Sequence, residues 1–237
     1  MNRHLRIRIA WGTLAMLAPL GVAWTGQAQD TKVQNPRIAP IEQYLMDKNT
    51  EMALARSAAP ESISRDAEVL VLGRQGYQSV AEGKNGFVCM VERAWTAGYD
   101  DPEFGSPQHR YPICYNPAAA RSHLPIVFKK TELALAGASK NELIDHIRAA
   151  FDKNELPTPE PGSMCYMMSK QAYFGKLYGH FHPHLMFFVP LTDGAAWGAG
   201  LPGSPIEVHE DAADRLSVYA ILVDTWSDGT AATSSHD

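Results

Sequence analysis

The sequence predicts an α+β fold with a mainly antiparallel sheet and with the helices on one face or at one end of it. Helical periodicity is confined to residues 40–60 and 118–152, whereas strand-like apolar runs gather in residues 67–95 and 163–226. The chain has no internal repeat and no regular alternation of strands and helices, which a doubly wound parallel sheet would show. These three observations together favour α+β over α/β.

The first expected element is a helix that begins at Pro40, because proline is tolerated in the first turn of a helix. Its apolar face extends from Ile41 to Ala55, and Pro60 ends it. The polar residues 29–37 before it show no periodicity and are expected to form an extended leader.

The pair Asn85-Gly86 predicts a hairpin turn within an antiparallel meander over residues 67–95. Strand-like runs flank the pair on both sides, and Asn-Gly in that setting is the strongest local hairpin signal. Side chains alternate along a strand, so Glu92 and Arg93 are expected on opposite faces of the last strand.

Residues 96–117 are expected to form a long loop, because they contain six glycines or prolines. A loop of that length is usually functional or covalently pinned. Two helices are expected next, at Ala118–Leu124 and Val127–Leu135. A third begins at Ser139, which forms a capping box with Glu142.

The last third of the chain is expected to supply most of the remaining strands. A proline-rich connector at residues 154–162 leads into a strand at Ser163–Ser169, and the histidine-rich strand described below follows. The final strands are expected at Ile206–Val208 and Leu216–Trp226.

Residues 1–28 have the pattern of a secretory signal. Three arginines precede an apolar run from Ile9 to Trp24, and small residues precede an expected cleavage after Ala28. The run is shorter than the roughly 20 residues that a membrane span requires. We therefore expect a secreted or periplasmic protein without a stable membrane span.

The mature chain is expected to contain one domain and to be acidic. Loss of the signal removes three basic and no acidic residues, so the net charge changes from −5 to −8. An acidic chain without a basic cluster argues against nucleic acid as a partner. The expected organisation is a leader and helix at 29–60, a single α+β domain at 61–226, and a flexible tail at 227–237.

The three cysteines predict one disulfide bond and one free thiol. An oxidising compartment favours pairing, and Cys89 and Cys114 lie in one region rich in turn-forming residues. In the chain-entropy model, a disulfide bond between them would stabilise the folded state by about 3 kcal/mol. Cys165 is then a buried thiol or a soft metal ligand.

The segment from Gly179 to Pro190 contains the best candidate site. On a strand, His180, His182, His184 and Met186 would share one face, and imidazole is the commonest metal ligand among side chains. The outer two histidines would lie roughly 13 Å apart, too far to share an ion. One neighbouring pair, with ligands from elsewhere, is the workable arrangement, and His182 and His184 are favoured.

Several ligand sets and functions remain open for this site. Met186 or Cys165 is a candidate third ligand and Glu92 a further one, around one zinc, iron, manganese or copper ion. A set rich in sulfur suits copper(I) and predicts a periplasmic copper carrier. An enzyme would use a metal-bound water, with Glu92 or Glu103 as its base and the 96–117 loop as a pocket wall. An unknown small ligand without a metal, or a purely structural role for the histidines, is also compatible with the residues.

Four segments resemble those of a group of uncharacterised secreted bacterial proteins. They are Asn85-Gly-Phe-Val-Cys89, Pro112-Ile-Cys114, Tyr166-Met-Met-Ser169 and Pro183-His-Leu-Met-Phe-Phe-Val-Pro190. The resemblance implies secretion and a Cys89–Cys114 bond. It also implies that His184 and Met186, more than His180, belong to the shared site. It implies no activity, cofactor or substrate.

Overall fold

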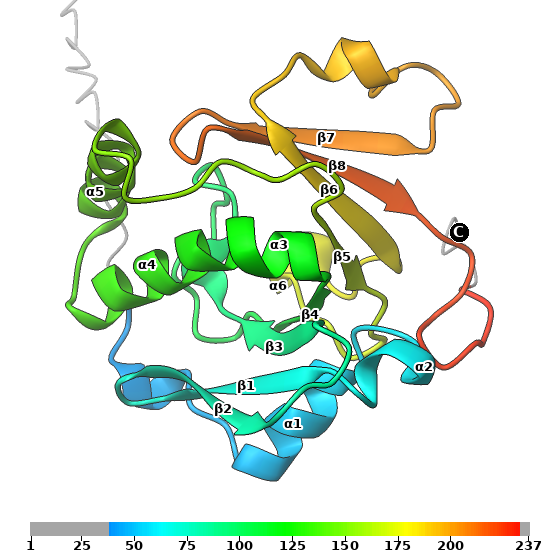
Figure 1. Cartoon of the computed structure of the whole chain (residues 1–237), viewed down its shortest axis with the longest axis horizontal. Helices are drawn as coiled ribbons and strands as arrows, with labels where there is room; N and C mark the ends of the chain where they lie inside the picture. The colour runs from blue at the N-terminus through cyan, green and yellow to red at the C-terminus, as the bar shows by residue number, and fades with distance from the viewer. Residues whose placement is uncertain (1–37, 233–237) are drawn as a thin grey trace, which may run out of the picture. The chain divides into compact units, whose positions relative to one another are not determined.

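A computed structural model describes residues 38–232 of the chain, so the expected signal at residues 1–28 lies outside the described part. The described residues form one eight-stranded sheet with helices packed against it (Figure 1). The strands are β1 (Glu68–Gly73), β2 (Gly76–Ala81), β3 (Val88–Glu92), β4 (Tyr111–Tyr115), β5 (Met164–Met167), β6 (His184–Pro190), β7 (Ile206–Asp211) and β8 (Leu216–Leu222). The α-helices are α1 (Lys48–Arg56), α2 (Glu61–Ser64), α3 (Pro117–Ser122), α4 (Leu124–Leu135), α5 (Lys140–Asp152) and α6 (Gly175–Tyr178).

The sheet is mainly antiparallel, as the sequence predicts. Its strand order is β2-β1-β3-β4-β5-β6-β8-β7, and β1 with β3 is its parallel pair. No helix within residues 38–232 is long and apolar enough to cross a membrane.

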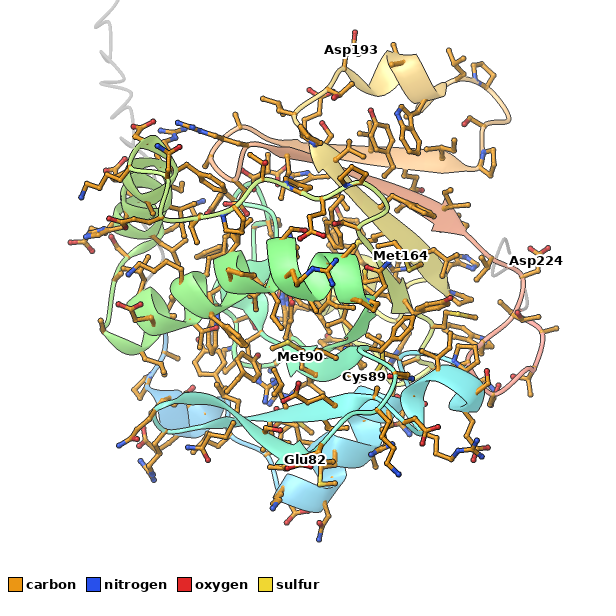
Figure 2. All side chains as sticks on the ribbon, viewed as in Figure 1. Glu82, Cys89, Met90, Met164, Asp193 and Asp224 are labelled. Atoms are coloured by element: carbon orange, nitrogen blue, oxygen red, sulfur yellow. A yellow bond between two sulfur atoms is a disulfide. The ribbon has the colours of Figure 1, made fainter. Side chains whose placement is uncertain are left out.

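Helices cover both faces of the sheet, which differs from the expectation of one face or one end. Helix α1 packs on the face that carries Val69, Cys89 and Cys114. Helices α3 and α4 pack on the opposite face, against alternate residues of the same strands such as Met90. Cys89 and Met90 are neighbours on β3 within this packed region (Figure 2). Two apolar layers are needed because β3 and β4 are apolar on both faces.

Helix α5 forms as predicted from its capping box. The Ser139 hydroxyl accepts the Glu142 amide N–H, and the Glu142 carboxylate accepts the Ser139 N–H at 2.8 Å. The buried stripe that follows includes Leu143, Ile147 and Phe151, which join a second core cluster with α4 and β8. Local sequence is sufficient here because both signals lie within the same helix.

The prediction of a hairpin at Asn85-Gly86 is wrong. Strand β2 pairs with β1 through the tight turn after Gly73, and β3 then pairs with β1 in parallel on its other edge. The Asn85 side chain binds the Ile63 carbonyl and the Phe87 N–H, at 2.8 and 3.1 Å. These bonds turn the chain across β1 instead of back along β2.

The expected loop at residues 96–117 contains the central strand β4. Pro112 lies on β4 opposite Val91 and has no N–H to donate. Pairing of β4 with β5 begins only at Cys114, so the proline lies beyond the doubly paired part of the strand. The Val91 carbonyl accepts the Tyr77 hydroxyl at 2.8 Å instead.

The predicted bond between Cys89 and Cys114 is confirmed, and Cys165 is a free, buried thiol. The two bonded residues face each other directly on β3 and β4. Near the other end of the chain, the expected flexible tail is folded as far as residue 232. A bridge joins Thr225 to Ala231, and Lys170 pairs with Asp228 at 2.7 Å.

A fully buried ion pair attaches α1 to the sheet. The Arg93 guanidinium binds the Glu51 carboxylate at 2.8 Å, and neither side chain is more than 1% exposed. Arg93 also donates to the carbonyls of Tyr44 and Val91, while Glu51 accepts the Leu72 N–H at 3.1 Å. The pair therefore joins the N-terminal segment, α1, β1 and β3.

We expect Arg93→Ala to lower the free energy of unfolding by about 3–5 kcal/mol, because Glu51 would remain charged and buried without its partner. Urea denaturation measures this change. Arg121→Ala is the matched control, since it breaks the exposed Arg121–Glu160 pair and should alter stability little. Equal losses in the two variants would contradict the role of the buried pair.

Candidate functional site

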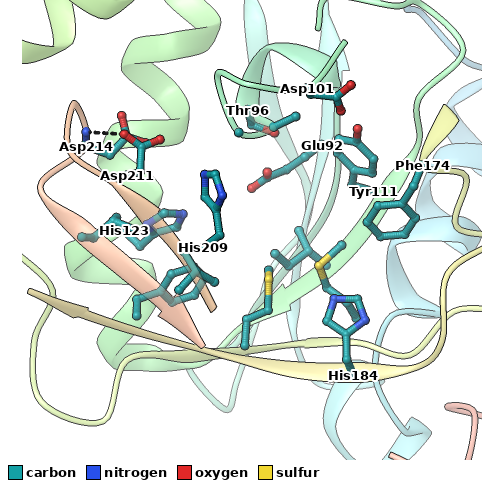
Figure 3. Close-up of a pocket in the computed structure, with 18 of the residues that line it drawn as sticks. Glu92, Thr96, Asp101, Tyr111, His123, Phe174, His184, His209, Asp211 and Asp214 are labelled. Carbon is teal, nitrogen blue, oxygen red and sulfur yellow. Dashed lines mark hydrogen bonds between the residues drawn. The ribbon is translucent and has the colours of Figure 1, made fainter. Parts of the chain in front are cut away.

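The face of the sheet that α3 and α4 cover contains a pocket of about 360 Å³. Its floor consists of alternate side chains of β4, β5, β6 and β8, including Ile113, Met167, Met186 and Val218. Loop residues 96–102 contribute to its wall, so part of the predicted 96–117 wall is present. Figure 3 shows Glu92 projecting into the pocket between a histidine-rich side and an aromatic side.

Glu92 is the buried carboxylate at the end of β3. Its residue is 6% exposed, and it accepts a hydrogen bond from the Tyr115 hydroxyl of the neighbouring strand. Burial raises the pKa of Glu92, and hydrogen bonds from Thr96 and Tyr115 oppose that rise only in part. Strand alternation places Glu92 in the pocket and Arg93 on the other face, as predicted.

His123 lies in the pocket wall between α3 and α4 and is neutral. Its ring stacks on Phe188 with the centroids 4.0 Å apart, and burial lowers its pKa to about 3. Its Nδ1 atom has no hydrogen-bond partner among the described residues. A neutral imidazole with an unpaired nitrogen can bind a ligand by a hydrogen bond.

The predicted histidine site is only partly assembled. His184 is the first residue of β6, so His180 and His182 lie before the strand and the shared face predicted for all three histidines does not form. His184 and Met186 do line the pocket, whereas His180 and His182 are absent from its lining. His180 instead contacts the Ala172 carbonyl through Nδ1 at 2.6 Å.

His184 presents a hydrogen-bond acceptor. Its Nδ1 lies 2.8 Å from the His182 carbonyl oxygen, and a carbonyl can only accept, so Nδ1 carries the proton. Burial lowers the pKa of His184. The neutral ring therefore keeps Nε2 as its acceptor.

Cys165 lies beside the pocket residue Met186 but does not line the pocket. Cys165 is fully buried on β5 opposite Met186, and burial raises its thiol pKa well above the ordinary value. Within residues 38–232, no three His, Cys, Asp or Glu side chains are grouped so that they could hold a metal ion. The metal hypothesis for His182, His184 and Met186 stays a prediction.

Buried polar side chains form a cluster on one side of the pocket. Lys130 of α4 pairs with Asp214 at 2.5 Å, and the Tyr99 hydroxyl donates to the same carboxylate at 2.9 Å. Asp211 accepts the N–H groups of residues 213 and 214, and burial raises its pKa. The cation of Lys130 is therefore already neutralised by Asp214.

His209 of β7 extends over the loop that follows β3. A Cβ on Gly98 would lie 2.8 Å from both the His209 Nε2 atom and the Asp100 Oδ1 atom. Glycine at this position therefore lets the ring approach the loop backbone closely, and it brings His209 and Asp100 to the same rim.

Sequence reasoning missed most of the polar lining. His209 and Asp211 are two residues apart and share the pocket face of β7. The sequence predicts a strand that ends at Val208, whereas β7 continues to Asp211 and its alternation places both side chains in the pocket. Tyr111 and Tyr115 lie on β4, which the sequence predicts to be part of a loop, so the pattern does not indicate that they line a pocket.

No protein-family model, curated protein or solved structure matches this chain. The geometry and electrostatics of the pocket therefore carry the functional interpretation.

Replacement of Glu92 by glutamine should stabilise the protein most at alkaline pH. The pKa of Glu92 is raised in the folded state, so the folded state holds the Glu92 proton more tightly than the unfolded state does. The free energy of unfolding therefore falls as the pH rises from the ordinary pKa of the unfolded state through the raised pKa of the folded state. Glu92→Gln cannot ionise and should escape this loss while it still accepts from Tyr115.

Thermal unfolding at a series of pH values measures the difference. The melting temperature of Glu92→Gln should exceed that of the wild type by a few degrees at pH 8, and the gap should close toward pH 4. Glu82→Gln, at an exposed site on the outer edge (Figure 2), is the control and should show no such trend. A gap that widened at acidic pH would contradict the raised pKa.

Proposed function

We propose that the pocket binds a small organic cation with an apolar body, and that recognition of this ligand is the function of a secreted protein. The single observation that carries the proposal is the buried Glu92 carboxylate, which has no cationic partner among the described residues. An unpaired buried charge is costly. A bound cation would remove that cost.

The charges of the pocket support a cationic ligand. Five carboxyl groups line it, at Glu92, Asp100, Asp101, Asp211 and Asp214, and no described lining residue is lysine or arginine. The nearby basic side chains are engaged elsewhere, since Lys130 binds Asp214 and Arg93 binds Glu51. A ligand bearing one positive charge would complement this lining.

The hydrogen-bonding groups favour a ligand that donates. Nε2 of His184 is an acceptor, and the Tyr115 hydroxyl is turned toward Glu92. His123 is neutral, so one of its ring nitrogens also accepts. An ammonium group carries donors and a positive charge, whereas a carboxylate or phosphate would meet like charge.

The apolar lining supports a compact hydrocarbon body. The floor contains Met167, Met186 and Phe188, and Phe174 lies against Tyr111 with the ring centroids 4.8 Å apart. Aromatic faces attract cations. The volume of about 360 Å³ is at the small end of the range for ligand pockets, which favours a ligand of the size of an arylalkylamine.

Calorimetric titration with three ligands of one shape tests the proposal. Benzylammonium should bind at least about tenfold more tightly than benzyl alcohol, and benzoate should not bind. Glu92→Gln should remove most of the preference for the cation. Binding should also weaken as the pH falls, because protonation of Glu92 removes the charge that the ligand neutralises.

The control is Glu82→Gln, which should bind like the wild type because it lies outside the pocket. Equal affinity for benzylammonium and benzyl alcohol would contradict the proposal. Elemental analysis of the same preparation, purified without chelator, tests the metal alternative. Near-stoichiometric zinc, iron, manganese or copper in the wild type, together with its loss in His184→Ala, would indicate that the pocket binds a metal ion instead of the proposed ligand.

A further inference from the structure

Tyr111 connects the pocket to two side chains that do not line it. Its hydroxyl lies 2.5 Å from Nδ1 of His109, and His109 is fully buried behind it. Beyond His109 lies Glu103, whose Oε2 atom is 4.0 Å from the His109 Nε2 atom. Figure 3 shows Tyr111 beside Glu92, on the aromatic side of the pocket.

The position of Glu103 is set by the backbone around Gly175. The Lys176 N–H donates to Glu103 Oε2 at 2.5 Å. A Cβ on Gly175 would overlap both Glu103 Oε2 and His109 Nε2, and Gly175 has a φ of +89°. Only glycine leaves room for the carboxylate to face the buried imidazole edge.

This arrangement selects one tautomer of His109. Burial lowers the pKa of His109, so the ring is neutral and carries one proton. A bare Nε2 lone pair opposite the carboxylate would be repelled, whereas an Nε2–H is attracted. Nε2 has no hydrogen-bond partner among the described residues. The charges of Asp101 and Glu103 both favour a proton on the ring, and the Glu103 carboxylate lies 4.0 Å from Nε2. Nδ1 is then an acceptor.

We propose that Tyr111 determines the specificity of the pocket by accepting a hydrogen bond from the ligand, an inference that rests on the proposed function. The pocket then prefers ammonium ligands that have N–H bonds to quaternary ammonium ligands, which have none. The Tyr111 proton is donated to His109, and the remaining lone pair of the oxygen is left for the ligand. Burial and the neighbouring carboxylates raise the pKa of Tyr111, so the phenol keeps its proton at neutral pH. Glu92 supplies the charge and Tyr111 supplies the hydrogen-bond discrimination.

Nitrogen NMR of the ligand-free protein tests the tautomer. The His109 signals, identified by their loss in His109→Gln, should show a protonated Nε2 and an unprotonated Nδ1. In Glu103→Gln the signals should shift toward the other tautomer, since a neutral amide no longer selects Nε2–H. A protonated Nδ1 in the wild type would overturn the inference.

Titration with benzylammonium and benzyltrimethylammonium tests the selectivity. The wild type should prefer benzylammonium, and Tyr111→Phe should reduce that preference by about tenfold. Glu103→Gln should reduce it as well, although Glu103 does not line the pocket. The matched control is Glu132→Gln, an exposed carboxylate on α4, which should leave the ratio unchanged.

Failure of the inference about Tyr111 can be distinguished from failure of the proposed function. If the wild type binds neither ligand, the proposed function fails, and the NMR result alone decides whether Tyr111 is an acceptor. If both ligands bind and Tyr111→Phe remains folded with an unchanged ratio, the inference about Tyr111 is overturned while the cation pocket stands.

Discussion

The buried pair of Glu51 and Arg93 is the interaction on which the arrangement of the pocket depends. Arg93 directly follows Glu92, so the alternation of the strand commits the two side chains to opposite faces of the sheet. Arg93 is held there by Glu51 and by the Tyr44 carbonyl. The end of β3 cannot rotate without breaking a buried ion pair, and this constraint keeps Glu92 directed into the pocket.

The pocket differs from the rest of the interior in how its charges are matched. Glu51 has Arg93 and Asp214 has Lys130, each at ion-pair distance. Among the described residues, Glu92 accepts a hydrogen bond from the Tyr115 hydroxyl and has no cation at ion-pair distance. Hydroxyl groups solvate a carboxylate less well than water does, so its charge remains unfavourable. The same deficit raises its pKa and gives the pocket its complementarity to a cation.

Local sequence was a good guide wherever the deciding contacts are close in the chain. The capping box of α5 joins residues three apart, and the opposite faces of Glu92 and Arg93 follow from adjacency alone. The Cys89–Cys114 bond was also foreseen. The Asn85-Gly86 hairpin failed because the competing partners of the turn, Ile63 among them, come from an earlier segment.

The sequence by itself predicted a mainly antiparallel α+β sheet, the Cys89–Cys114 bond and the capped helix, and it singled out His184 and Met186, which line the pocket. The tertiary structure alone decided which side chains share the pocket. Glu92, His123, His184 and Asp211 come from distant parts of the chain and meet through strand order and helix packing. Burial then sets their charge states, because the free energy of an ionised group depends on the surroundings that the whole fold provides. A local sequence pattern does not contain information about those surroundings.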